Sequence, residues 1–198
     1  QIRAFRLPTE YNDVNRVVVL GMGGTAIGGD LVADLATLEG TLPIHVCRDY
    51  TTPPGIGPKT LVIASSYSGD TEETVEAFDE AVSRKAKVVG ITSGGTLKQR
   101  CYKLGAPVVD IAFNGEPRSA LGYSFVPLLG LLCNLGLISD QEQPIQEAIS
   151  LMQRQQGAIA PETTIDGNSA KMLAQSLHSR LVVIYGAGIL TGVARRWK

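Results

Sequence analysis

Histidine and cysteine are scarce in this chain, and their scarcity argues against several kinds of site. Its 198 residues include two histidines and three cysteines, which are scattered along the sequence. No metal-ligand spacing occurs, so no metal site is predicted. The cysteines are odd in number and have apolar neighbours, which is typical of buried free thiols in a reducing cytoplasm rather than of a disulfide framework.

An excess of either charge is also missing. The sequence has 18 Lys and Arg against 19 Asp and Glu, and this balance predicts no nucleic-acid partner and no membrane partner. The longest apolar run, Phe125 to Ile138, contains Asn134 and is shorter than the ~20 residues that span a bilayer. We predict that it forms a core helix in a cytoplasmic protein.

Apolar runs alternate with helical patterns from Arg16 to about Phe113. The runs are rich in Val and Ile and lack polar alternation, as expected of strands buried on both faces of a parallel sheet. Such alternation indicates βαβ units. We therefore predict an α/β fold with a doubly wound, mostly parallel five-stranded sheet. The predicted strands are Arg16–Leu20, Ile44–Cys47, Thr60–Ala64, Lys87–Thr92 and Pro107–Ala112, and the helices between them are Ala26–Leu38, Thr71–Arg84 and Thr96–Leu104.

From Ser119 the pattern is mainly helical, and it ends in a near-repeat of the first strand. The run Arg-Val-Val-Val-Leu-Gly from Arg16 is echoed by Arg-Leu-Val-Val-Ile-Tyr-Gly from Arg180, which indicates a duplicated α/β domain. The later helices are predicted over Ser124–Leu137, Gln141–Gln156 and Asn168–Ser179. The predicted organisation is a first domain over residues 1–140, connector helices over 141–179, and an incomplete second domain over 180–198, in which the chain is truncated after one strand and part of a helix.

The loop after the third predicted strand is rich in hydroxyl groups. Residues 65–74 are Ser-Ser-Tyr-Ser-Gly-Asp-Thr-Glu-Glu-Thr and lead into a helix. Hydroxyl and N–H donors at a helix N-terminus suit a phosphate, and the absence of Lys and Arg from the loop favours a sugar phosphate over a nucleoside triphosphate. We predict Ser66, Ser68 and Thr71 as donors, and Asp70 with Glu73 as a capping box whose charges turn away from the phosphate.

The loop after the first predicted strand is rich in glycine. Residues 21–30 are Gly-Met-Gly-Gly-Thr-Ala-Ile-Gly-Gly-Asp, and such glycines let a backbone turn sharply towards a ligand at the next helix. The loop contains the dinucleotide pattern Gly-x-Gly-x-x-Ala, and Asp49 stands where a ribose-binding acid could lie. Alternatively, the glycines only permit tight strand–helix packing. A ligand-binding loop is favoured because two strand ends carry such loops.

A third segment, Glu-Pro-Arg-Ser-Ala at residues 116–120, follows the fifth predicted strand. Arg118 could reach the same crevice and stabilise an enediolate, although a solvated surface arginine explains this loop equally well when it is taken alone. His45 lies in an apolar strand and is interpreted as a core residue.

These three motifs resemble the sugar isomerase (SIS) domain family, and within it the bifunctional phosphoglucose/phosphomannose isomerases. The resemblance covers nearly the whole chain in order, and the family's two tandem SIS domains agree with the near-repeat at Arg180. It implies that Arg118 is the arginine that steadies the enediol intermediate. It also implies that the sugar and its phosphate are contacted by Gly24, Thr25, Ser66, Ser68 and Thr71.

The activity implied by the resemblance is aldose–ketose isomerisation. Fructose 6-phosphate would be interconverted with glucose 6-phosphate, and with mannose 6-phosphate, through a cis-enediol and without a metal or redox cofactor. The family acts as a homodimer, and its general base is a glutamate that would lie shortly beyond Lys198. These 198 residues alone are therefore expected to bind sugar phosphate weakly and not to turn it over.

Two other functions stay open from the sequence. A non-catalytic sugar-phosphate sensor could use the same fold and loops. An NAD-dependent oxidoreductase is suggested by the glycine pattern and Asp49, but a dinucleotide site has no need of the hydroxyl-rich loop.

Overall fold

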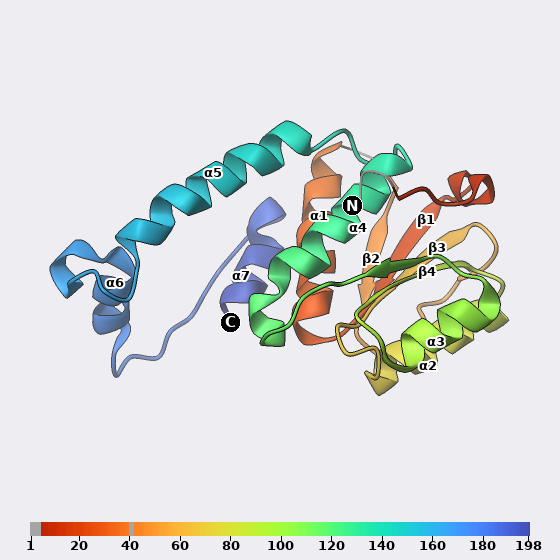
Figure 1. Ribbon diagram of the computed structural model, residues 1–198, viewed down its shortest axis with the longest axis horizontal. Helices are drawn as coiled ribbons and strands as arrows, with labels where there is room; N and C mark the ends of the chain where they lie inside the picture. Colours follow the sequence, from red (N-terminus) through yellow and green to blue (C-terminus); the bar gives the residue numbers. More distant parts are fainter. Residues whose placement is uncertain (1–4, 40–41) are drawn as a thin grey trace. The chain divides into compact units, whose positions relative to one another are not determined.

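A parallel sheet of five strands lies at the centre of the first part of the chain (Figure 1). The computed structural model describes residues 5–39 and 42–198. All neighbouring strands run parallel, in the order β2-β1-β3-β4-β5. The strands are β1 Arg16–Leu20, β2 Ile44–Cys47, β3 Thr60–Ser65, β4 Lys87–Thr92 and β5 Val108–Asp110. The predicted five-stranded α/β fold is confirmed.

Helices cover both faces of this sheet (Figure 1). Helices α2 and α3 share one face, where Phe78 and Leu97 pack against strand residues such as Val62. Helices α1 and α4 pack against each other, and α1 lies on the opposite face, where Gly29 meets Val19. The elements are η2 Thr9–Asn12, α1 Gly23–Glu39, α2 Glu72–Ser83, α3 Gly95–Leu104, η3 Pro117–Ser119, α4 Leu121–Asn134, η5 Gly188–Leu190 and α7 Thr191–Trp197.

Helix α4 is the predicted core helix, and it buries Leu128, Leu131 and Leu132. It begins and ends three residues earlier than predicted. It stops at Asn134 because Gly136 takes a left-handed φ of 69°, which lets the N–H groups after the helix bond back to its last carbonyls. Within the described ranges, no helix is both long and apolar enough to cross a membrane.

The strands differ in how deeply they are buried. All six residues of β3 are buried because β3 has a strand on each side and helices on both faces. Strand β2 is at the edge of the sheet, and of its four residues Cys47 alone is buried. The prediction that His45 is a core residue is wrong, because this edge strand leaves its side chain exposed.

The chain divides into two compact units, one reaching Ser139 and including Gly186–Lys198, the other Asp140–Tyr185. The second unit contains α5 Glu142–Ala158, η4 Ile165–Gly167 and α6 Ser169–Leu177. The side chain of Asn168 organises it, since its Oδ1 accepts from the N–H of Lys171 and its Nδ2 donates to the carbonyl of Ala160, each at 3.0 Å.

The strand predicted from Arg180 is not formed. Residues 181–187 have no strand structure, and Leu181 and Tyr185 are 94% and 90% exposed. A strand needs a hydrogen-bonded neighbour, and this segment pairs with none among the described residues. The assignment of residues 180–198 to a second domain stays a prediction.

Candidate active site

A cavity of about 290 Å³ lies at the carboxyl ends of β1 and β3. The chain moves outward from β1 to β2 on one side and begins β3 on the other, so the strand order reverses between β1 and β3. This switch point is where open α/β sheets bind ligands. The cavity is lined by Met22, Gly23, Gly24, Thr25, Tyr67, Ser68, Thr71, Ile111, Ala120 and Ser124.

The first turn of α1 forms one wall. Gly23 has a φ of 48°, which favours glycine, and it turns the chain from β1 directly into the helix. Gly24 is exposed. The N–H groups of Thr25 and Ala26 donate to the Met22 carbonyl, so the donors that the first turn offers are the N–H groups of Gly23 and Gly24, which have no partner inside a helix. The Thr25 hydroxyl donates to the carbonyl of Met22 at 2.8 Å, which leaves its oxygen lone pairs as acceptors. The wall therefore offers backbone donors and one acceptor.

The other glycines of this loop serve packing. A Cβ on Gly28 would lie 2.8 Å from Oγ of Ser124 in α4, and one on Gly29 would lie 3.0 Å from Cγ1 of Val19 in the sheet. For the glycine-rich loop, the packing interpretation is thus confirmed at Gly28 and Gly29, whereas ligand binding stays a prediction. Its first glycines line the cavity, and its last ones let α1 approach α4 and the sheet.

The hydroxyl-rich loop forms the opposite wall. Ser68 and Thr71 line the cavity, whereas Ser66 is buried and lies outside the lining. The Oγ of Ser66 lies 2.9 Å from Oγ1 of Thr71 and accepts from the N–H of Gly69 at 3.1 Å. Ser66 therefore holds the loop that presents the other two hydroxyls.

Asp70 caps a helix, but not the predicted one. Helix α2 begins after Thr71 without a side-chain cap, so the capping box with Glu73 is wrong. The carboxylate of Asp70 instead accepts from the N–H and the hydroxyl of Thr96, each at 2.8 Å, at the start of α3. These two bonds lower the pKa of Asp70. The carboxylate of Asp70 is thus directed at α3, and Asp70 does not line the cavity. This agrees with the prediction that its charge turns away from that site.

Arg118 does not line the cavity. It lies in η3 and is exposed, and its carbonyl accepts from Nη2 of Arg196 in α7 at 3.0 Å. Its neighbour Ala120 is part of the lining, so the segment that carries Arg118 runs past the cavity. The structure thus brings together Gly24, Thr25, Ser68 and Thr71, supports them with Ser66, and leaves the side chain of Arg118 outside.

Sequence reasoning missed two polar residues of the lining, Tyr67 and Ser124. Tyr67 lies between two predicted donors, and its position in the motif could have indicated it. Ser124 carries no such signal, because its Oγ comes within 3.4 Å of the Gly24 carbonyl only when α4 packs on α1. Asp49, the alternative ribose-binding acid, lies outside the lining and accepts from the N–H of Tyr50 at 2.7 Å.

The lining contains no acidic or basic side chain among the residues that the structure describes. An anion here would meet hydroxyls, N–H groups and the positive ends of the α1 and α2 dipoles. In residues 5–39 and 42–198, no group of His, Cys, Asp and Glu could hold a metal ion. No disulfide forms among the residues that the structure describes. Cys47 and Cys101 are buried, and burial raises the pKa of Cys101 to about 11, whereas Cys133 is only half-buried, so the prediction of a buried thiol is wrong for it.

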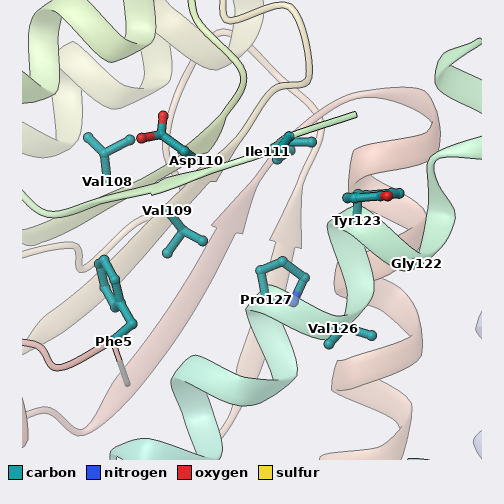
Figure 2. Close-up of a pocket in the computed structure, with 10 residues that line it drawn as sticks. Phe5, Val108, Val109, Asp110, Ile111, Gly122, Tyr123, Val126 and Pro127 are labelled. Carbon is teal, nitrogen blue, oxygen red and sulfur yellow. The ribbon is translucent and has the colours of Figure 1, made fainter. Parts of the chain in front are cut away.

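A second, larger cavity of about 420 Å³ lies beside the edge strand β5 (Figure 2). It is a groove between β5 and α4, and Phe5 and Tyr123 lie near its two ends. Most of its wall is apolar, including Val109, Val126 and Pro127. It lacks the hydroxyl cluster that an anion requires, so the smaller cavity is the candidate active site.

The SIS domain family profile matches residues 10–121, which contain both loops of the candidate site. The chain belongs to the SIS domain family. It is 43% identical over 187 residues to the bifunctional phosphoglucose/phosphomannose isomerase of Caldicellulosiruptor bescii, covering 94% of this chain and 55% of that protein. It is 34% identical over 195 residues to the isomerase of the same name from Thermoplasma acidophilum, covering 98% of this chain and 56% of that protein.

Solved structures agree on the fold of this SIS protein. The C-terminal domain of glucosamine-fructose-6-phosphate aminotransferase from Francisella tularensis superposes with a TM-score of 0.61 at 14% identity, covering 94% of this chain and 55% of that domain. Such low identity supports the SIS fold alone. The chain spans about half the length of the curated relatives named above.

Proposed function

We propose that this chain binds a sugar phosphate in the cavity between α1, α2 and α4, as the substrate-binding part of a phosphoglucose/phosphomannose isomerase. The observation that carries the proposal is the convergence of Ser68, Thr71 and the first turn of α1 at the strand-order switch. The similarity to curated isomerases over nearly the whole chain supports the reaction class.

In this proposal the phosphate sits against the hydroxyl-rich loop. Ser68 and Thr71 donate to it, Ser66 fixes their geometry, and the α2 dipole favours its negative charge. Gly24 and Thr25 contact the sugar from the α1 side, and Arg118 stabilises the enediolate oxygens. Isomerisation also requires a base that removes the proton beside the carbonyl, and the proposal assigns this step to a residue outside the cavity lining.

The proposal also covers the compartment, the oligomeric state and the cofactors of the protein. We infer a cytoplasmic homodimer that uses no metal or redox cofactor, and the absence of a disulfide among the described residues agrees with a reducing compartment. Gel filtration with light scattering tests the dimer, and a monomer at micromolar concentration would contradict it.

Calorimetric titration of this chain tests the binding site. We expect saturable binding of fructose 6-phosphate and glucose 6-phosphate, and none of free fructose. Ser68→Ala and Thr71→Val should each weaken binding by about 5- to 10-fold, the value of one hydrogen bond to a charged group. The control is Ser150→Ala on α5, whose hydroxyl bonds only to its own helix at the Gln146 carbonyl. Equal binding of fructose, or undiminished binding by both cavity variants, would overturn the site.

Two further measurements separate the alternatives. Saturable binding of NADH would favour the oxidoreductase. An isomerase assay of the protein that contains this chain, with fructose 6-phosphate as substrate, distinguishes an enzyme from a sensor, because a sensor binds the same ligand without turnover.

A further inference from the structure

We propose that Tyr67 is a positioning residue, which ties the loop that carries Arg118 to the hydroxyl-rich loop and so sets where Arg118 acts on the bound sugar. The inference rests on the proposed function, since it concerns the same cavity. Tyr67 lines the cavity with part of its surface, and its hydroxyl points to a different loop.

The backbone of Tyr67 is firmly held. Its carbonyl accepts from the N–H of Ser93 at 3.1 Å and from the hydroxyl of Ser93 at 2.6 Å, so the residue is bonded to the loop after β4. The residue before it is bonded as well, because the N–H of Ser66 donates to the carbonyl of Ile91 at 3.1 Å. Tyr67 therefore projects from a part of the site whose position is fixed by two neighbouring strands.

The hydroxyl of Tyr67 donates to the carbonyl of Phe113 at 2.8 Å, across 46 positions of sequence. The two rings also meet edge to face, with centroids 6.0 Å apart, and the ring of Phe113 packs on that of Tyr123 with centroids 4.8 Å apart as well. One side chain thus supplies a hydrogen bond and an aromatic contact to the same residue.

The segment that receives these contacts has little other support. Residues 111–116 form no helix or strand, and β5 before them is an edge strand of three residues. The N–H of Ile111 donates to the Thr92 carbonyl, the Tyr67 hydroxyl donates to the Phe113 carbonyl, and beyond these the Arg118 carbonyl accepts from Arg196. A loop with few bonds samples many positions, so a tie at Phe113 restricts the space that Arg118 explores.

Kinetics of the protein that contains this chain test the proposal through Tyr67→Phe, which keeps the ring and removes the bond. We expect kcat for fructose 6-phosphate to fall about tenfold while KM stays within twofold, because Ser68 and Thr71 still bind the phosphate. In an Arg118→Ala background, Tyr67→Phe should cause no further loss, since both changes act through one side chain. Tyr102→Phe is the control, as Tyr102 is 62% exposed on α3.

Amide hydrogen exchange of this chain gives a readout that needs no activity. In Tyr67→Phe, amides from Phe113 to Ser119 should exchange at least fivefold faster, while those from Ser66 to Thr71 keep their rates. Unchanged exchange, a raised KM at constant kcat, or additive losses with Arg118→Ala would overturn the proposal. If the wild-type protein shows no turnover, the proposed function fails, and the role of Tyr67 in catalysis fails with it even where exchange confirms the tie.

Discussion

The hydroxyl-rich loop at residues 65–74 and the arginine loop at 111–120 both follow a strand and both lead into a helix, but they are held differently. The first is bonded through its backbone to β4 and α3, with Ser66 N–H on Ile91 and Leu97 N–H on the Gly69 carbonyl. The second has one such backbone bond, from the Ile111 N–H to the Thr92 carbonyl, and beyond it receives side chains, from Tyr67 at Phe113 and from Arg196 at Arg118.

The reason for this difference is the place of each strand in the sheet. The hydroxyl-rich loop leaves the central strand β3, which has neighbours on both sides, whereas the arginine loop leaves the edge strand β5. Loops from a central strand find bonding partners in the loops of its neighbours. The hydroxyl-rich loop is therefore fixed by backbone bonds, whereas the position of the arginine loop depends on a few long-range contacts.

The largest contrast is expected from adding one methyl group to each loop. Gly69 has a φ of 80°, and a Cβ there would lie 1.9 Å from the carbonyl oxygen of Gly94. Gly69→Ala should therefore lower the free energy of unfolding by about 3 kcal/mol. The three atoms nearest to a Cβ on Gly115 belong to the ring of Phe113, and a side chain gives way more easily than a backbone carbonyl, so Gly115→Ala should cost only about 1 kcal/mol. Urea denaturation measures both, and equal losses would contradict the comparison.

Removing one hydroxyl from each loop should give a smaller contrast. Ser66 is buried and accepts from the Gly69 N–H, so Ser66→Ala leaves a donor without its partner and should cost about 1–2 kcal/mol. Ser119 is exposed and donates only to the nearby Glu116 carbonyl, so Ser119→Ala should stay within about 0.5 kcal/mol. Thermal unfolding of the two variants checks this, and a larger loss at Ser119 would reverse the conclusion.

The smallest effect is a pH dependence confined to the hydroxyl-rich loop. The bonds from Thr96 lower the pKa of Asp70 below its unfolded value, so their contribution to stability is present above that value and is lost as the pH falls through the folded one. Asp70→Asn should lower Tm slightly at pH 7, and the difference from wild type should shrink below about pH 4. Glu116→Gln, in the arginine loop, is the control. A difference in Tm that persists unchanged at pH 3 would show that the charge is not responsible.

Much of the fold could be predicted because burial dictates composition. Strands such as Thr60–Ser65, which have neighbours on both sides, need Val, Leu and Ile on both faces, and their runs were visible in the sequence. The two loops that form the cavity walls could also be predicted, because glycine and hydroxyl residues cluster directly after two of these strands. The position of β2 at the edge of the sheet could not be predicted from composition. The prediction that His45 is a core residue was therefore wrong.

The near-repeat shows most clearly what local composition determines and what tertiary structure decides. Arg16–Leu20 and the similar run after Arg180 have the same strand-forming composition, yet only the first forms a strand, between β2 and β3. Composition by itself determined the α/β class, the two loops that line the cavity and the uncharged residues that they place there. The tertiary structure alone decided which runs become strands, that Asp70 caps α3, and that Tyr67 reaches Phe113, because each of these depends on a partner distant in the sequence.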